Sequence, residues 1–199
     1  MQSIQRKLYT SVAVYNEELH ESLRNKNNIE RYMQTALQNE EFKLFLQPKF
    51  DLKNNCMVGA EALVRWQKPD GTYRYPGEFI PIFEANGFCL KLDMYMVDLV
   101  CRQLRLWIDS GVTPFPISIN QSKLLFFNGN YVNDLLQVIN RYRISPGLIT
   151  LEILEDVAMN SLEEINYRIE DLHSKGFKVS MDDFGSGYSS LNMLYQLRI

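Results

Sequence analysis

The sequence contains few of the residues that build disulfide frameworks and zinc sites. Its 199 residues include three cysteines and two histidines, and no two cysteines have the CxxC spacing. Cys56, Cys89 and Cys101 are expected to be free thiols, because an odd number of dispersed cysteines is not typical of a disulfide-bonded, secreted protein. We therefore expect the chain to lie in the reducing cytoplasm, whether or not a longer parent protein is membrane-anchored.

The sequence also lacks a long apolar run and an excess of charge of one sign. No stretch approaches the roughly 20 apolar residues of a membrane span, and the first residues do not form a signal-peptide core. The formal net charge is −3, with 21 basic and 24 acidic residues interspersed. This pattern excludes the concentrated basic stripe of a duplex nucleic-acid binder. It leaves room for a small anionic ligand, because a few local groups set the field in one cleft.

Strand-like and helical segments alternate along most of the chain. Residues 11–39 are predicted to be helical, with a polar interruption at residues 25–28 (NKNN). Five strands are predicted near residues 42–46, 57–66, 116–120, 149–154 and 177–183. Further helices are predicted near residues 78–85, 91–109, 131–142 and 162–174, and from Ser189 onward. Such alternation with short connections indicates an α/β domain with a largely parallel sheet.

Polar side chains recur on four of these strands, mostly where a strand ends. They are Glu61, Asn120, Glu152 followed by Glu155, and the pair Asp182 and Asp183. Taken singly, Asn120 is typical of a turn and the two aspartates of a turn cap. Because a buried, unpaired carboxylate is strongly disfavoured, oxygen ligands on four consecutive strands together favour a shared cation. Oxygen ligands without histidine or cysteine indicate a hard ion such as Mg²⁺ or Mn²⁺.

Six segments in one order resemble the motifs of the EAL family of cyclic-di-GMP phosphodiesterases. They are FLQP (45–48), GAEALVRW (59–66), PGEFIP (76–81) with Glu84, ISINQS (117–122), LEILE (151–155) and DDFGSGYSS (182–190). The resemblance covers residues 29–199. Residues 1–28 are similar to a linker helix or to the end of an upstream GGDEF-type or sensor domain.

The resemblance implies a function and a set of site residues. Family members hydrolyse cyclic di-GMP to linear pGpG at a site with two Mg²⁺ or Mn²⁺ ions, and two such ions activate water and stabilise both the entering and the leaving oxygen. By position, the implied metal ligands, which include the catalytic residues, are Glu61, Asn120, Glu152, Asp182 and Asp183. Gln47, Leu63 and Arg65 are implied to bind substrate, and Glu155 to support the loop at 184–190. A surface ion pair is the alternative role for Arg65.

The family fold implied by the resemblance is a TIM-like (β/α)₈ barrel. Such a barrel has eight strands and about 250 residues, whereas five strands are predicted here. The lysine and the further glutamate that the family supplies from later strands have no counterpart before Ile199. We therefore expect an incomplete barrel, residues 29–199 being its first part.

Three functions remain open at this point. The first is metal-dependent hydrolysis of cyclic di-GMP, and the second is a non-catalytic sensor of the same ligand. The third is an interaction module that uses the helices before residue 38. A homodimer is a further expectation that rests on the family resemblance alone.

Overall fold

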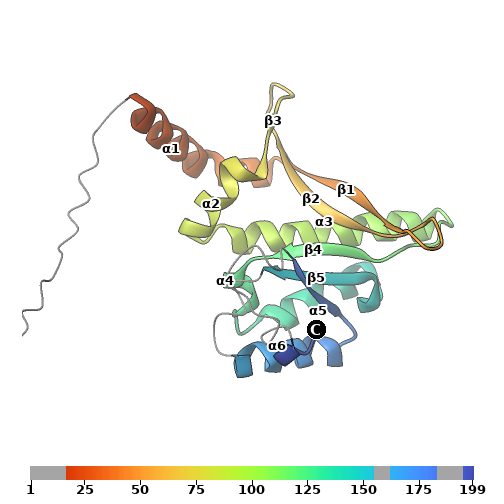
Figure 1. Ribbon diagram of the computed structural model, residues 1–199. Helices are drawn as coiled ribbons and strands as arrows, with labels where there is room; N and C mark the ends of the chain where they lie inside the picture. The colour runs from red at the N-terminus through yellow and green to blue at the C-terminus, as the bar shows by residue number, and fades with distance from the viewer. Residues whose placement is uncertain (1–16, 155–161, 183–194) are drawn as a thin grey trace, which may run out of the picture.

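The computed structural model describes residues 17–154, 162–182 and 195–199, in which helices and strands alternate (Figure 1). The helices are α1 (Glu17–Gln38), α2 (Pro76–Asn86), α3 (Cys89–Asp109), α4 (Lys123–Phe126), α5 (Tyr131–Tyr142), the 3₁₀ helix η1 (Pro146–Leu148) and α6 (Leu162–Ser174). The strands are β1 (Phe42–Asp51), β2 (Cys56–Gln67), β3 (Tyr73–Arg74), β4 (Ile117–Gln121), β5 (Ile149–Leu154) and β6 (Lys178–Asp182). All five predicted strands are present, and the short β3 is an addition.

The strands form one open sheet in the order β1-β2-β4-β5-β6, with β3 paired to β2. β1 and β2 are an antiparallel hairpin, whereas β2, β4, β5 and β6 are parallel to one another. This arrangement confirms the predicted α/β class with a largely parallel sheet. Because parallel strands end at the same edge, the carboxyl ends of β2, β4, β5 and β6 lie together, where α/β folds place their ligands.

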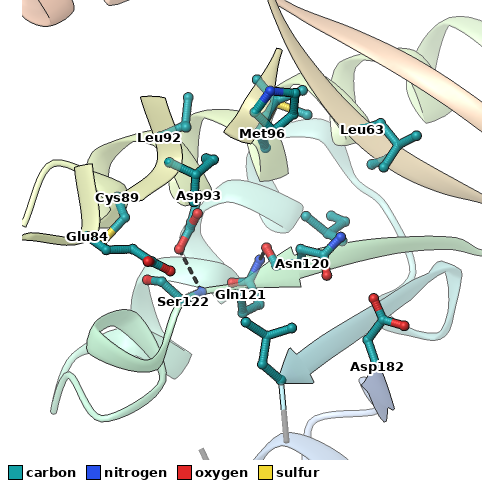
Figure 2. A pocket seen from close by; sticks show the side chains of 16 residues that line it. Leu63, Glu84, Cys89, Leu92, Asp93, Met96, Asn120, Gln121, Ser122 and Asp182 are labelled. Carbon is teal, nitrogen blue, oxygen red and sulfur yellow. Dashed lines mark hydrogen bonds between the residues drawn. The ribbon is translucent and has the colours of Figure 1, made fainter. Parts of the chain in front are cut away.

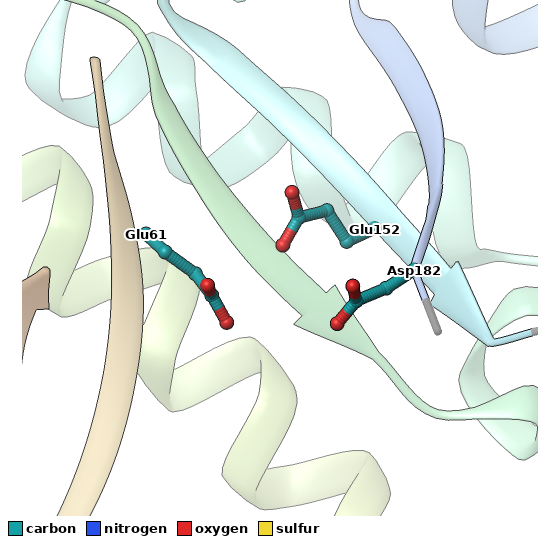
Figure 3. Close-up of side chains that lie close together, drawn as sticks. All are labelled: Glu61, Glu152 and Asp182. Atoms are coloured by element: carbon teal, nitrogen blue, oxygen red, sulfur yellow. The ribbon is translucent and has the colours of Figure 1, made fainter. Parts of the chain in front are cut away.

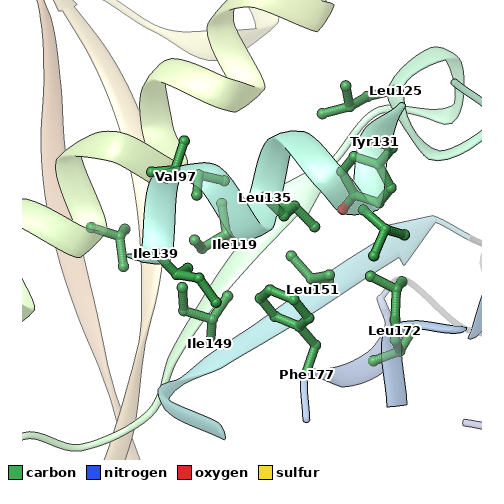
Figure 4. Close-up of a cluster of buried hydrophobic side chains, with 14 of the residues drawn as sticks. Val97, Ile119, Leu125, Tyr131, Leu135, Ile139, Ile149, Leu151, Leu172 and Phe177 are labelled. Atoms are coloured by element: carbon green, nitrogen blue, oxygen red, sulfur yellow. The ribbon is translucent and has the colours of Figure 1, made fainter. Parts of the chain in front are cut away.

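The two faces of the sheet differ in chemistry. In β5, Ile149, Leu151 and Ile153 are fully buried and alternate with Thr150 and Glu152. The buried set packs against side chains of α3, α5 and α6, which cover that face (Figure 4). The alternation of a strand sends the remaining side chains to the opposite face. The helices therefore leave one face of the sheet to the polar residues.

A second, aromatic cluster joins α1 and α2 to the hairpin. Its fully buried members are Ile29, Ala36, Phe42, Trp66, Phe79, Phe83, Phe88, Cys89 and Leu92. Edge-to-face and tilted ring contacts connect Phe42, Trp66 and Phe83, a geometry that stabilises aromatic clusters beyond the area they bury. The cluster fixes the last turns of α1 against the start of β1.

The helix α1 differs from the prediction at its polar segment. The run at residues 25–28 was expected to interrupt the helix, but α1 continues through it from Glu17 to Gln38. That prediction is wrong because asparagine and lysine weaken a helix only slightly, and Ile29 and Ala36 are buried just beyond them. Among the described helices, none combines the length and apolarity needed to cross a bilayer.

Gly59 marks a close approach between two backbones. A Cβ atom at this position would stand 2.9 Å from the carbonyl oxygen of Pro116. The next amide, that of Ala60, donates a hydrogen bond of 3.1 Å to the same oxygen. Glycine is therefore required where β2 begins to pair with β4.

Candidate metal and substrate site

Three carboxylates from three strands meet on the polar face of the sheet. Glu61 lies on β2, Glu152 on β5 and Asp182 at the end of β6 (Figure 3). One ligand atom from each side chain lies within 4.8 Å of the other two. Carboxylate oxygens at such separations suit a hard divalent cation, which relieves the repulsion between them. The structure thus brings together three of the residues predicted to bind metal.

Asn120 lies beside this cluster, as its position at the end of β4 predicted. Its Nδ2 atom donates a hydrogen bond of 3.1 Å to Oε1 of Glu61. Asn120 is also in register with Glu152 on the neighbouring strand. Turning the amide by half a rotation would present the oxygen to the same place, since the two ends of an amide have the same shape. Asp183 and Glu155, also predicted, lie outside the described residues.

Glu152 has two oxygens in different surroundings. Oε1 accepts a 2.6 Å hydrogen bond from Nζ of Lys49, which also donates to Oγ of Ser118 at 2.8 Å. Oε2 is buried and has no hydrogen-bond partner among the residues that the structure describes. A buried carboxylate oxygen without a partner is costly. The unpartnered Oε2 atom is therefore suited to binding a cation.

Lys49 was missed by the sequence reasoning. It lies 103 residues from Glu152 in the sequence, so no local pattern reports the contact. One signal was available, because Lys49 follows Gln47 by two residues and therefore shares its face of β1. Once Gln47 is placed toward the site, Lys49 is expected to point the same way.

The residues predicted to bind substrate lie on the hairpin next to the carboxylates. Gln47 is the cross-strand partner of Glu61, and Leu63 lines a neighbouring cavity. Arg65 donates from Nη1 to the carbonyl oxygen of Val64 at 2.8 Å, and its Cζ lies 5.8 Å from the ring centre of Tyr75. Gln47, Leu63 and Arg65 alternate with residues on the other face of the hairpin, so all three approach the site from one side.

The cavity holds about 300 Å³ and lies between β2, β4 and the helices α2 and α3 (Figure 2). Its lining is mostly apolar, with Asn120 and Asp182 among its polar members. A mostly apolar cleft with a few convergent polar groups is typical of a small-molecule site. The cavity adjoins the carboxylate cluster, because Asp182 belongs to both.

A second set of polar residues in this cavity lies around Asp93. The amide of Ser122 donates to Oδ2 of Asp93 at 2.8 Å, and Glu84 also lines the cavity (Figure 2). Burial raises the pKa of Asp93 to about 6, with a further contribution from Glu84, although the hydrogen bonds from Ser122 act the other way. Asp93, an acid between Leu92 and Met94 on α3, was not predicted from the sequence.

Comparison with known proteins identifies the family. The family model described as the EAL domain matches residues 30–199. The chain belongs to the EAL family. Its order of motifs and its sheet agree with that assignment, which confirms the predicted resemblance.

Two relatives show how much of a longer protein this chain corresponds to. The signaling protein YkoW of Bacillus subtilis is 36% identical over 169 residues, which are 85% of this chain and 21% of YkoW. The bifunctional diguanylate cyclase/cyclic di-GMP phosphodiesterase MucR of Pseudomonas aeruginosa is 35% identical over 165 residues, 83% of this chain and 24% of MucR. The chain thus spans a fifth to a quarter of the length of these relatives.

Solved EAL structures have the same fold. The MucR phosphodiesterase in complex with c-di-GMP matches with a TM-score of 0.79 and 34% identity, over 86% of this chain and 69% of that one. The EAL enzyme Bd1971, in a form bound to cAMP and cyclic di-GMP, matches with a TM-score of 0.79 and 29% identity, over 92% of this chain and 50% of that one. These matches confirm the TIM-like EAL architecture for the sheet and helices described above.

Proposed function

We propose that this EAL domain takes part in the hydrolysis of cyclic di-GMP to linear pGpG, with Mg²⁺ or Mn²⁺ as cofactor. The observation that carries the proposal is the convergence of Glu61, Glu152 and Asp182, one ligand atom of each within 4.8 Å of the others. The partnerless, buried Oε2 of Glu152 supports a cation at this point. The relative MucR, whose name includes cyclic di-GMP phosphodiesterase activity and whose structure was solved with c-di-GMP, supports the substrate.

In this proposal each side chain has a separate task. Glu61, Asn120, Glu152 and Asp182 hold the first cation, and Asp183 contributes to a second. When bound, the cations supply a water activated for attack and neutralise charge on the phosphate. Arg65 contacts a phosphate oxygen, for which a guanidinium is well shaped. Gln47 and Leu63 contact the nucleotide on the hairpin side, next to the cavity.

The domain limits and the setting of the chain are also part of the proposal. Residues 29–199 form the EAL part, and residues 1–28 connect it to an upstream domain. The cytoplasm is the proposed location, since cyclic di-GMP is a second messenger inside bacterial cells, and a homodimer is the proposed assembly.

The test is a cyclic-di-GMP hydrolysis assay on the 199-residue chain with Mn²⁺, followed by detection of pGpG. Because the lysine and the glutamate of the family's later strands have no counterpart before Ile199, we expect full activity only from a chain extended past Ile199. Any pGpG that forms, from either chain, should be lost in Glu61→Ala. Glu21→Ala is the matched control, since Glu21 is exposed on α1 far from the cluster. Product that persists in Glu61→Ala would contradict the proposal.

Calorimetric titration with cyclic di-GMP in Ca²⁺ separates catalysis from binding. Heat of binding without hydrolysis in Mn²⁺ would replace the enzyme by a sensor of the same ligand. Absence of heat and of product would leave neither function standing for this chain, and the interaction-module hypothesis would take their place.

A further inference from the structure

The ammonium of Lys49 occupies one side of a proposed metal ligand. Lys49 is on β1 and Glu152 on β5, and their ion pair has an Nζ–Oε1 distance of 2.6 Å. The Glu152 side chain is 8% exposed and that of Lys49 is 42% exposed. The ion pair therefore has a buried acid and a partly solvated base. Ser118 on β4 accepts a second bond from the same ammonium and fixes its place.

The two oxygens of the Glu152 carboxylate thus have different surroundings. Oε1 is bonded to Lys49, whereas the buried Oε2 has no partner in the part of the chain that the structure describes. Glu61, Glu152 and Asp182 each bring one carboxylate oxygen within 4.8 Å of the others, and Oε2 is the oxygen of Glu152 that Lys49 leaves unbonded. Lys49 and a cation bound at Oε2 would then share one carboxylate, with two positive charges on its two oxygens.

We propose that Lys49 is a built-in counter-ion that opposes the metal electrostatically and so lowers the metal affinity of the site. Without metal, Lys49 offsets the negative charge that converges from Glu61, Glu152 and Asp182. With metal, the same ammonium repels the incoming cation through the shared carboxylate. This inference rests on the metal site proposed above and assigns to Lys49 a role that the metal ligands themselves do not have.

The effect of Lys49 on metal affinity has a definite sign, because the ammonium and the metal ion are thermodynamically linked. Removing the ammonium leaves a buried carboxylate without compensation in the metal-free protein, which is strongly unfavourable. A bound metal relieves most of that cost. Removal of Lys49 therefore destabilises the metal-free state more than the metal-bound state, and reciprocity makes metal binding tighter.

The first measurement is the dissociation constant for Mn²⁺, read from the electron paramagnetic resonance signal of free Mn²⁺ during titration. We expect Lys49→Met to bind Mn²⁺ about tenfold more tightly than the unchanged chain, a factor that corresponds to about 1.4 kcal/mol. Lys49→Arg keeps the charge and stays within about twofold. Lys53→Met removes the same charge from the exposed turn between β1 and β2 and leaves the constant unchanged.

Thermal unfolding supplies a second readout that needs no substrate. In EDTA, Lys49→Met should melt below the unchanged chain, and saturating Mn²⁺ should raise its melting temperature by more than it raises that of the unchanged chain. Lys49→Gln removes the charge but keeps a hydrogen-bond donor, and it gives the same direction if Lys49→Met does not fold.

Two results would overturn the inference in distinguishable ways. If the unchanged chain binds Mn²⁺ and Lys49→Met and Lys49→Gln bind it equally or more weakly, Lys49 is not an opposing counter-ion, although the metal site stands. If the unchanged chain binds no Mn²⁺, the proposed metal site is wrong and the inference is wrong with it.

Discussion

Two buried glutamates lie in different regions of the molecule, Glu41 beside the aromatic cluster and Glu152 in the proposed metal site. Glu41 lies between α1 and the hairpin, and its carboxylate accepts hydrogen bonds from Tyr32, Asn39 and Trp66. Glu152 lies on the polar face of the sheet with one oxygen bonded and the other without a described partner. Both side chains are nearly excluded from solvent, so burial alone does not separate them. The difference is that both oxygens of Glu41 accept hydrogen bonds, whereas Oε2 of Glu152 accepts none from the described residues.

The pKa of Glu41 shows what full satisfaction does to a buried acid. Burial by itself raises its pKa, but the hydrogen bonds from Tyr32, Trp66 and Asn39 outweigh burial and hold the pKa below its usual value. A lowered folded-state pKa means that this stabilisation is present above the ordinary carboxyl range and is lost as the pH falls through the folded pKa. Glu41 is therefore a structural group that holds α1 to β1.

The largest expected effect comes from Glu152→Gln, which removes one of the three carboxylates of the proposed metal site. We expect Mn²⁺ affinity to fall at least about 100-fold, beyond the 10- to 100-fold typical of groups that only support a ligand. Titration of Mn²⁺ measures it. Glu41→Gln is the matched control, because it changes a buried glutamate of the other region and should leave Mn²⁺ affinity unaltered. Equal losses in both variants would contradict this difference between the two regions.

Glu41→Ala is expected to lower the stability of the fold and to leave metal binding unchanged. It leaves the indole Nε1 of Trp66 buried without its acceptor, and such a loss costs about 1–3 kcal/mol in the free energy of unfolding. Chemical denaturation with urea measures this value, with Glu21→Ala on the exposed surface of α1 as the control. A change in Glu41→Ala no greater than that in Glu21→Ala would show that the hydrogen bonds of Glu41 contribute nothing.

An effect of similar size to that of Glu41→Ala is expected from Asp93→Asn, and it appears in the pH dependence of stability. The folded-state pKa of Asp93 is raised from 3.8 to about 6. The folded protein therefore binds more protons than the unfolded chain between these values, and Asp93 makes the protein less stable as the pH rises through that window. Asp93→Asn should remove this slope in a series of denaturation curves from pH 4 to pH 6.5. A slope identical to that of the unchanged chain would contradict the raised pKa.

The smallest effect is expected from an ion pair on the surface. Arg105 and Asp109 on α3 are separated by 2.6 Å, as Lys49 and Glu152 are, but the Asp109 side chain is 63% exposed. Exposed pairs spaced four residues apart on a helix contribute about 0.3–0.5 kcal/mol. Asp109→Asn should therefore lower the free energy of unfolding by about 0.5 kcal/mol or less in urea. A loss several times larger would show that distance, and not burial, governs these pairs.

The sequence predicted the parts of the fold that depend on local periodicity. The helices at 131–142 and 162–174 have the expected bounds, because apolar residues recur there at helical spacing. The side chains of Glu61, Asn120, Glu152 and Asp182 lie together in the structure, as expected for polar residues near the carboxyl ends of parallel strands. The segment 59–66 also carries one of the motifs on which the family resemblance was based.

The contacts that were missed depend on pairing between distant segments. Lys49 reaches Glu152 across β2 and β4, which lie between β1 and β5 in the sheet. The alternation of β1 indicates the face on which Lys49 lies but not this partner. Burial raises the pKa of Asp93, and that burial depends on a cavity to which β2, α2, α3, β4, β5 and β6 all contribute residues. The continuity of α1 through residues 25–28 depends on burial of Ile29 and Ala36 against the aromatic cluster, which overrides a weak local preference.

The glycine at the start of β2 has a consequence for how freely the sequence of this domain can vary. Gly59 sits two residues before Glu61, where a Cβ would come within 2.9 Å of the carbonyl oxygen of Pro116. That oxygen belongs to the backbone and has no side-chain rotamer with which to yield. Any other residue at position 59 would force β2 away from β4 and widen the gap between Glu61 and Asn120. The lack of a side chain at position 59 thus keeps β2 and β4 close enough for Glu61 and Asn120 to meet.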